Sequence, residues 1–349
     1  MKRIALVSTL FLVGAISTAF SGPLPWVADQ HAGWATSARR SAAPQLLAQW
    51  EPPFLPEGVA VDGHNNVYAS FPYVGQIVKI APNGQVSVHA TLPAPYGMAA
   101  SDDGVLFVAS TPAAGGANVG VYAVRPDGSV LKLPGSQNMI LANAVALAED
   151  GKLYATDSVD GAVWRFDRNG GARWLRDPLL AGNGFAGFGV PIGANGIAVR
   201  DHTVYVANSE QGHLVAIHIN RDGSPGKSRI LAGPGLVGME GVAAGADGNV
   251  YFSIVAAFHP GTGEPLQYAN SVVRIRPHNG RLQVIADADD GLNCPANMAF
   301  GHRSERDQLY LVNFGAFPGG GFFPPSVCKI HLRSVREPHH GDQGDDDQQ

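Results

Sequence analysis

With 349 residues, 45% of them hydrophobic, the chain is long enough to bury a sizeable core. Its formal net charge of -5 excludes a general electrostatic attraction to nucleic acid. The 44 glycines and 25 prolines are spaced at intervals rather than gathered in low-complexity blocks, as the turns between many short strands require.

The N-terminal segment has the pattern of a secretory signal peptide. A charged start, Met1-Lys-Arg3, precedes an apolar run from Ile4 to Ile16, and Ala19-Phe-Ser21 offers a cleavage site of small residues. The run is too short for a convincing membrane span, although an uncleaved membrane anchor is the alternative. We therefore expect a signal peptide at residues 1–21, a linker at residues 22–42, and a mature protein that is periplasmic or secreted.

A unit of four strands recurs along the rest of the chain. It opens with a polar or aromatic residue followed by an apolar strand, as in Glu57-Gly-Val-Ala-Val61 and Asn195-Gly-Ile-Ala-Val199. An aromatic-rich second strand and an alternating third strand follow, and a turn such as Pro82-Asn-Gly84 leads to the fourth. Asn-Gly and Asp-Gly supply the positive φ that a two-residue hairpin needs.

Six such units predict an all-β protein, a six-bladed β-propeller. The sixth unit contains only three strands, and the isolated strand near Gln45–Trp50 can supply the fourth. This N-terminal strand would join the last blade, close the ring and leave no open sheet edge. We expect the propeller to span residues 43–335 and to be followed by a disordered acidic tail at residues 336–349.

The connections between strands differ in length on the two faces of such a ring. Second-to-third and fourth-to-first connections include long segments such as Leu175–Gly193, which places function on that face. The residues that open the six inner strands point toward the same face. By alignment of the repeats, these residues are Glu57, Tyr96, Asn143, Asn195, Glu240 and Asn297.

Four of these opening residues form a candidate metal site: Glu57, Asn143, Asn195 and Glu240. Two carboxylates and two amide oxygens suit one hard divalent cation, and the cation would remove the repulsion between the carboxylates on a narrow axis. Calcium is our first choice for such ligands, while zinc, magnesium or manganese would also be accommodated. The competing interpretation is that an Asn before Gly only forms a turn, and we assign Asn297 such a structural role.

On these motifs the chain resembles the SMP-30/gluconolactonase/LRE-like family of six-bladed propellers, over about residues 45–333. Pro56-Glu57-Gly58, Ala142-Asn143 and Ala194-Asn195-Gly196 match the family's Glu and Asn ligands, and Glu240 stands where the family carries Asp. The resemblance implies a hydrolase of a lactone or related ester, with a metal ion that polarises the carbonyl group. It also implies that Glu240 is the base that activates water.

Several residues depart from the family pattern. Ala144 replaces an acidic residue that often follows the first Asn, and Leu141 stands where sugar lactonases tend to carry a polar contact. The loops Phe185–Gly189 and Phe314–Phe323 are rich in apolar residues. We therefore expect a small-molecule substrate that is more hydrophobic than a sugar lactone.

Two histidines are further candidates for acid/base catalysis. His213 starts a third strand and His259 lies in a long loop, both on the face where related paraoxonase-type propellers place histidines. The alternative for each is an ordinary solvated loop residue. The two cysteines, Cys294 and Cys328, are either paired in a disulfide or free.

Two other functions share the predicted fold. One is a non-catalytic NHL-type propeller that binds a ligand or a protein, and the other is a strictosidine-synthase-like enzyme or a lyase. The sequence contains no Gly-x-Ser-x-Gly nucleophile motif. We expect a monomer that binds neither nucleic acid nor, after signal cleavage, a membrane.

Overall fold

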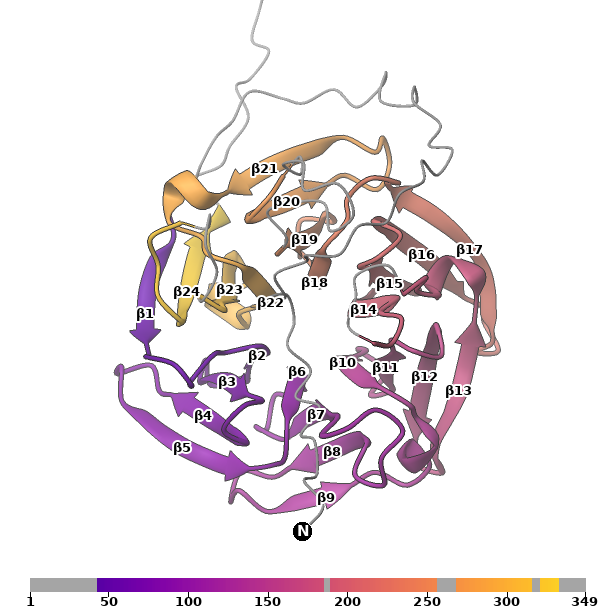
Figure 1. Cartoon of the computed structure of the whole chain (residues 1–349), viewed down its shortest axis with the longest axis horizontal. Coiled ribbons are helices and arrows are strands. Elements are labelled where there is room, and N and C mark those ends of the chain that lie inside the picture. The colour runs from indigo at the N-terminus through magenta and orange to yellow at the C-terminus, as the bar shows by residue number, and fades with distance from the viewer. Residues whose placement is uncertain (1–42, 185–188, 256–267, 316–320, 333–349) are drawn as a thin grey trace, which may run out of the picture.

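The computed structural model describes residues 43–184, 189–255, 268–315 and 321–332. In this part of the chain the strands form six antiparallel sheets of four strands each, arranged as blades around a central axis (Figure 1). The predicted all-β, six-bladed propeller is therefore confirmed. The predicted signal peptide, linker and acidic tail lie outside the described residues. Within the described ranges, no helix is long and apolar enough to cross a membrane.

The first strand of each blade, here called the inner strand, lies nearest the axis (Figure 1). Blades 1 and 2 contain β2 (Val59–Val61), β3 (Val67–Phe71), β4 (Gln76–Ile80), β5 (Val86–Thr91), and β6 (Pro95–Ala100), β7 (Leu106–Ser110), β8 (Gly120–Val124), β9 (Val130–Lys132). Blades 3 and 4 contain β10 (Ala142–Leu147), β11 (Leu153–Asp157), β12 (Ala162–Asp167), β13 (Gly170–Arg176), and β14 (Ala194–Arg200), β15 (Thr203–Asn208), β16 (His213–Ile219), β17 (Pro225–Ala232). Blades 5 and 6 contain β18 (Met239–Ala244), β19 (Val250–Ile254), β20 (Ser271–Ile275), β21 (Leu282–Ala286), and β22 (Pro295–Phe300), β23 (Gln308–Asn313), β24 (Ser326–His331) with β1 (Gln45–Gln49). Short 3-10 helices lie in the connections at η1 (Ser136–Asn138), η2 (Pro178–Leu180), η3 (Ala288–Asp290) and η4 (Arg303–Glu305).

The ring closes through the N-terminal strand, as predicted. Strand β1 pairs antiparallel with β24, so the last sheet runs in the order β1-β24-β23-β22. The next residue, Trp50, donates its backbone N–H to the carbonyl of Pro325 at 2.8 Å. Its indole ring meets Phe71 of blade 1 edge to face, with 4.9 Å between ring centroids. The closing segment therefore joins blade 6 to blade 1.

The hydrophobic core lies between neighbouring blades. In one cluster, Tyr68 and Ile77 of blade 1 are buried together with Leu106 and Val108 of blade 2. Burial of each large apolar side chain in such a cluster contributes about 1.5–3 kcal/mol. Because every blade packs on two neighbours, the ring as a whole fixes the position of the inner strands.

Glycine follows the opening residue in four blades because the inner strands approach one another closely at their starts. A Cβ on Gly58, Gly196 or Gly241 would lie 2.2, 2.0 or 2.6 Å from the carbonyl oxygen of the opening residue in the next blade. Real Cβ atoms do not approach another atom so closely. Glycine therefore recurs after the opening residue because neighbouring inner strands are in contact around the axis.

Strand pairing corrects the sequence alignment of the sixth repeat. In blades 1 to 5 the opening residue stands two positions before the residue at which regular pairing with the second strand begins. In blade 6 that paired residue is Met298, opposite Leu311, so the equivalent opening residue is Ala296. The expectation that Asn297 opens the sixth copy was wrong by one residue, because Asn297 occupies the position that glycine holds in other blades.

Candidate metal centre

The four predicted ligands occupy equivalent positions at the starts of inner strands. Glu57 lies shortly before β2, Asn143 is in β10, Asn195 in β14 and Glu240 in β18. None of the four residues is more than 3% exposed. Each is thus held at the axial end of its blade, away from bulk solvent.

Hydrogen bonds join three of the four residues. Asn195 Nδ2 donates to Glu240 Oε2 at 2.8 Å and to the hydroxyl of Ser209 at 2.9 Å. The carboxyl groups of Glu57 and Glu240 are hydrogen-bonded to each other. Ser209 in turn donates to the carbonyl of Met239 at 2.7 Å, which fixes Asn195 against the strand that carries Glu240.

Each predicted ligand presents one buried oxygen that has no hydrogen-bond partner. These atoms are Glu57 Oε1, Asn143 Oδ1, Asn195 Oδ1 and Glu240 Oε1. A buried polar atom without a partner costs about 1–3 kcal/mol, so four of them at equivalent positions call for a bound group. Two carboxylate and two amide oxygens fit a hard divalent cation. Across the described ranges, no three His, Cys, Asp or Glu side chains are grouped to hold a metal ion, so a centre here depends on its two amides.

The pKa values of Glu57 and Glu240 also favour a bound divalent cation. Burial raises the pKa of Glu57 to about 7. Burial also raises the pKa of Glu240 well above its usual range, and the negative charge of Glu57 raises it further. Without a cation, the two carboxyl groups are therefore expected to hold a shared proton at neutral pH. A divalent cation would displace that proton and compensate both charges.

Hydroxyl groups on second strands hold the starts of the inner strands in place. Ser70 accepts the N–H of Gly58 at 2.8 Å and donates to the carbonyl of Tyr96 in the next blade at 2.7 Å. Thr156 does the same with the N–H of Ala144 at 3.1 Å and the carbonyl of Asn195 at 2.7 Å.

Blade 5 repeats the arrangement, since Ser253 accepts from Gly241 at 2.9 Å and donates to Ala296 at 2.6 Å. Sequence reasoning missed these residues. The available signal was a hydroxyl at one position of the second strand in alternate blades, where the others carry Ala109, Ala207 and Val312.

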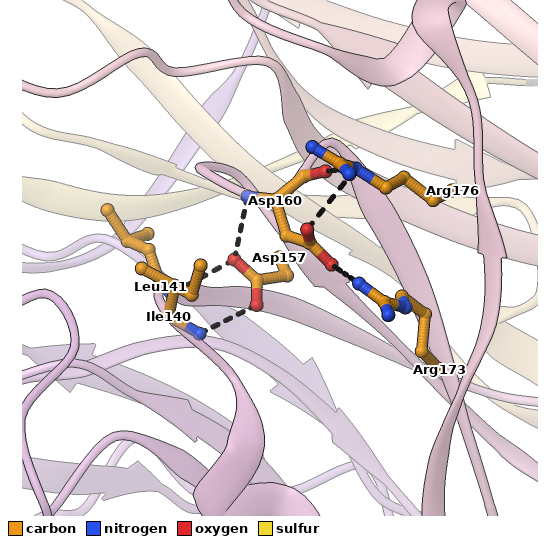
Figure 2. A network of polar contacts seen from close by, with 6 residues as sticks. All are labelled: Ile140, Leu141, Asp157, Asp160, Arg173 and Arg176. Carbon is orange, nitrogen blue, oxygen red and sulfur yellow. Dashed lines mark hydrogen bonds and ion pairs between the residues drawn. The ribbon is translucent and has the colours of Figure 1, made fainter.

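A buried carboxylate anchors the loop that leads to Asn143 (Figure 2). Asp157, at the end of β11, accepts the backbone N–H groups of Ile140 at 2.7 Å and Leu141 at 3.0 Å. Burial raises the pKa of Asp157, while these backbone donors act in the opposite direction. The neighbouring Asp160 pairs with Arg173 at 2.8 Å, which ties the same turn to the outer strand β13. Sequence analysis did not identify Asp157.

Of the two candidate histidines, the one that the structure describes is not part of the hydrogen-bonded group. His213, the first residue of β16, is buried, and its Nε2 lies 2.7 Å from the carbonyl oxygen of Leu179. Burial lowers the pKa of His213, so the neutral ring donates to that carbonyl. His259 lies outside the described residues.

Both cysteines are free and buried, so the structure selects the free-thiol alternative. Cys328 lies in β24, where its sulfur is 3.4 Å from Asn313 Nδ2. Cys294 lies just before β22, and burial raises the pKa of its thiol. The negative charges of Glu57 and Glu240 raise this pKa further, which places Cys294 in the neighbourhood of the carboxyl pair.

Comparison with known proteins identifies the fold. The sequence matches no protein-family model and none of the curated proteins with which it was compared. A gluconolactonase from Xanthomonas campestris is 16% identical, with a TM-score of 0.59 over 83% of this chain and 96% of that one. The calcium-binding protein regucalcin from Agrobacterium tumefaciens is 14% identical, with a TM-score of 0.61 over 84% of this chain and 95% of that one.

A virginiamycin B lyase from Staphylococcus aureus is also similar, at 15% identity and a TM-score of 0.53 over 81% of this chain and 82% of that one. Gluconolactonase and regucalcin structures are thus among the propellers that this chain resembles. At these identities, the likeness establishes a shared propeller fold.

Proposed function

We propose that the protein is a divalent-metal-dependent hydrolase of a lactone or related ester, with its centre on the propeller axis. The observation that carries this proposal is the set of four unpaired, buried oxygens on Glu57, Asn143, Asn195 and Glu240. Turn formation by Asn does not account for it, because turn formation would use the Asn side-chain oxygens rather than leave them unbonded.

The side chains around the axis have different proposed roles in cation binding and in catalysis. Asn195 holds Oε2 of Glu240 and leaves Oε1 free. With Oε1 assigned to the cation, Oε2 is the oxygen of Glu240 that would accept a proton from water, in the role of a general base. A bound divalent cation would polarise the carbonyl group of the substrate and stabilise the developing oxyanion. Burial of all four side chains keeps bulk water from weakening these interactions.

Aromatic side chains on the long-loop face favour an apolar substrate. Tyr73, in the connection between β3 and β4, meets Phe314, which follows β23, edge to face at 6.0 Å between ring centroids. Phe322 and Phe323 form a second such pair at 5.0 Å, and Phe322 is 73% exposed. We propose that the substrate carries an alkyl or aryl group beside its ester bond.

The test combines metal analysis with hydrolysis assays. Purified protein is expected to contain a divalent cation and to hydrolyse members of a panel of alkyl and aryl lactones and esters, with loss of activity on chelation. Glu57→Gln and Glu240→Gln should lose both the cation and the activity. Asp62→Asn is the matched control, because Asp62 is a buried carboxylate just beyond the other end of the same strand β2.

Three results would contradict the proposal in different ways. If the purified protein contains no cation and its activity is unchanged by both Glu substitutions, it has no axial metal centre. A bound cation without turnover indicates a binding propeller. A product that has not gained the mass of one water indicates a lyase.

We also propose that the protein is exported, as the signal-peptide pattern of residues 1–21 indicates. Fractionation of producing cells, followed by N-terminal sequencing, should find the mature chain outside the cytoplasm, beginning near Gly22. Retention of Met1 on a cytoplasmic protein would contradict export.

A further inference from the structure

We infer that Asn297 is a positioning residue for Glu57, and that it couples closure of the ring to the geometry of the metal centre. The inference rests on the proposed function, because Glu57 matters here as a ligand. Asn297 lies 240 residues away from Glu57 in the sequence, so only the closed ring brings the two together.

Asn297 makes two hydrogen bonds to one atom, the carbonyl oxygen of Glu57. The backbone N–H and the side-chain Nδ2 of Asn297 each donate to the carbonyl oxygen of Glu57 at 3.2 Å. On its other side, Glu57 donates its own N–H to the carbonyl of Ser70 at 3.0 Å. Glu57 precedes the short strand β2 rather than lying within it, so these bonds fix its backbone together with those that the next residue, Gly58, makes to Ser70.

The position of Asn297 in the repeat makes this contact specific to the closing junction. In blades 1, 2, 4 and 5 the same position holds glycine, and an added Cβ at Gly58, Gly196 or Gly241 would strike the next blade's opening carbonyl. At the junction from blade 6 to blade 1, the chain instead carries an amide that reaches the opening carbonyl. Asn297 therefore takes the place of glycine and bonds to the residue that bears the first carboxylate.

Closure of the ring affects the position of the metal ligand Glu57. Strand β1, which leads the chain into blade 1, belongs to the sixth sheet through its pairing with β24 alone. The height of Glu57 relative to Glu240 therefore depends on non-covalent contacts across this junction. A shift of Glu57 along the axis would move its carboxylate away from the hydrogen-bonded partner on Glu240. Groups that orient metal ligands in this way are typically worth a tenfold to hundredfold change in metal affinity.

The test measures cation affinity in variants of the full chain, with Ca²⁺ and Co²⁺ each titrated alone by calorimetry. Asn297→Gly removes the side-chain amide donor and introduces the glycine of four other blades, whereas Asn297→Leu removes the side-chain donor but keeps the branched shape. Ala144→Gly is the matched control, since Ala144 has the same register in blade 3 and has no polar side chain. Both Asn297 variants are expected to bind each cation about tenfold more weakly, and the control to bind as the native protein does.

A metal-free measurement separates this inference from the proposed function. If the native protein binds no cation, the proposed centre fails, and the contact is judged by exchange of the Asn297 side-chain amide protons in NMR spectra. Slow exchange, lost when Glu57 is displaced by truncation of strand β1, supports the contact. Exchange at the rate of a free amide overturns the inference, as does native affinity in a folded Asn297→Leu variant.

Discussion

Glu57 and Glu240 bring two buried carboxyl groups into contact at the propeller axis. Two buried carboxyl groups that hydrogen-bond to each other cannot both ionise without a compensating charge. Asn195 stabilises the ionised form of Glu240 with one hydrogen bond, which is too little to offset burial and the charge of Glu57. The pair is therefore a destabilising feature of the metal-free protein that a cation converts into a stabilising one.

This predicts how the stability of the metal-free protein depends on pH. The pKa of Glu57 is raised from 4.5 to about 7, so between these values the folded state binds more protons than the unfolded state. The contribution of Glu57 to the free energy of unfolding should therefore fall by on the order of 3 kcal/mol as pH rises from about 5 to about 7, and the raised pKa of Glu240 should continue the fall at higher pH. Urea unfolding of chelated protein across this range measures the effect.

Glu57→Gln is the variant that isolates the effect. It should reduce the dependence on pH to the part that the buried Glu240 contributes, and make the chelated protein more stable than the native chain at about pH 8, because it removes a buried charge. A saturating cation should remove the dependence in the native chain and have no effect on the variant. Equal pH dependence in both chelated proteins would contradict this account of the pair.

At the scale of the strand, glycine and hydroxyl residues set how closely inner strands approach. Gly196 lies against the carbonyl of Glu240, and Thr156 donates to the carbonyl of Asn195. Both contacts act on the backbone of ligand residues rather than on their side chains. Substitutions there should thus disturb the metal centre without removing any ligand.

Gly196→Ala tests this expectation. Its Cβ would lie 2.0 Å from the carbonyl oxygen of Glu240, so strand β18 must move. We expect a loss of about 1–3 kcal/mol in the free energy of unfolding, as for other overpacked sites, together with weaker cation binding. Urea unfolding and calorimetric titration measure the two effects.

Gly84→Ala is the control for Gly196→Ala. Gly84 has a φ of +83°, and a methyl group added to it would have no other atom within 4 Å. Alanine there therefore costs conformational strain of about 1–2 kcal/mol and nothing else. Its cation affinity should remain native. Native affinity in Gly196→Ala as well would show that close packing at the axis does not position Glu240.

At the scale of the whole molecule, strand β1 completes the ring. It pairs with β24 through four residues and carries the chain to Trp50, whose ring packs on Phe71 of blade 1. Without β1, blade 6 would end in an exposed edge of β24, which is a template for pairing with another chain. Closure therefore protects solubility as well as the geometry of the axis.

Truncation tests the role of this strand. A chain that begins at residue 51 should have a free energy of unfolding about 4 kcal/mol lower than one that begins at residue 43, if each of the four paired residues contributes about 1 kcal/mol. It should also form oligomers through the open edge and bind cations weakly. Size-exclusion chromatography and thermal unfolding compare the two chains. A monomeric shorter chain of unchanged stability would show that closure does not depend on β1.

The sequence by itself determined the propeller and the positions of its candidate ligands. Strand alternation, Asn-Gly turns and the residue–Gly phrase are local patterns that repeat, so Glu57, Asn143, Asn195 and Glu240 could be aligned without a structure. The need for a closing strand followed from counting strands in the last repeat. Each of these features is encoded within a few consecutive residues.

Only the tertiary structure decided which atoms meet at the axis. The register of blade 6 depends on the pairing of β22 with β23, which moved Asn297 out of the opening position and brought it to Glu57. The free oxygens of the four ligands and the hydrogen bond between Glu57 and Glu240 likewise exist only in the closed ring. These features join residues far apart in the chain, and their distances are set by the packing of all six blades.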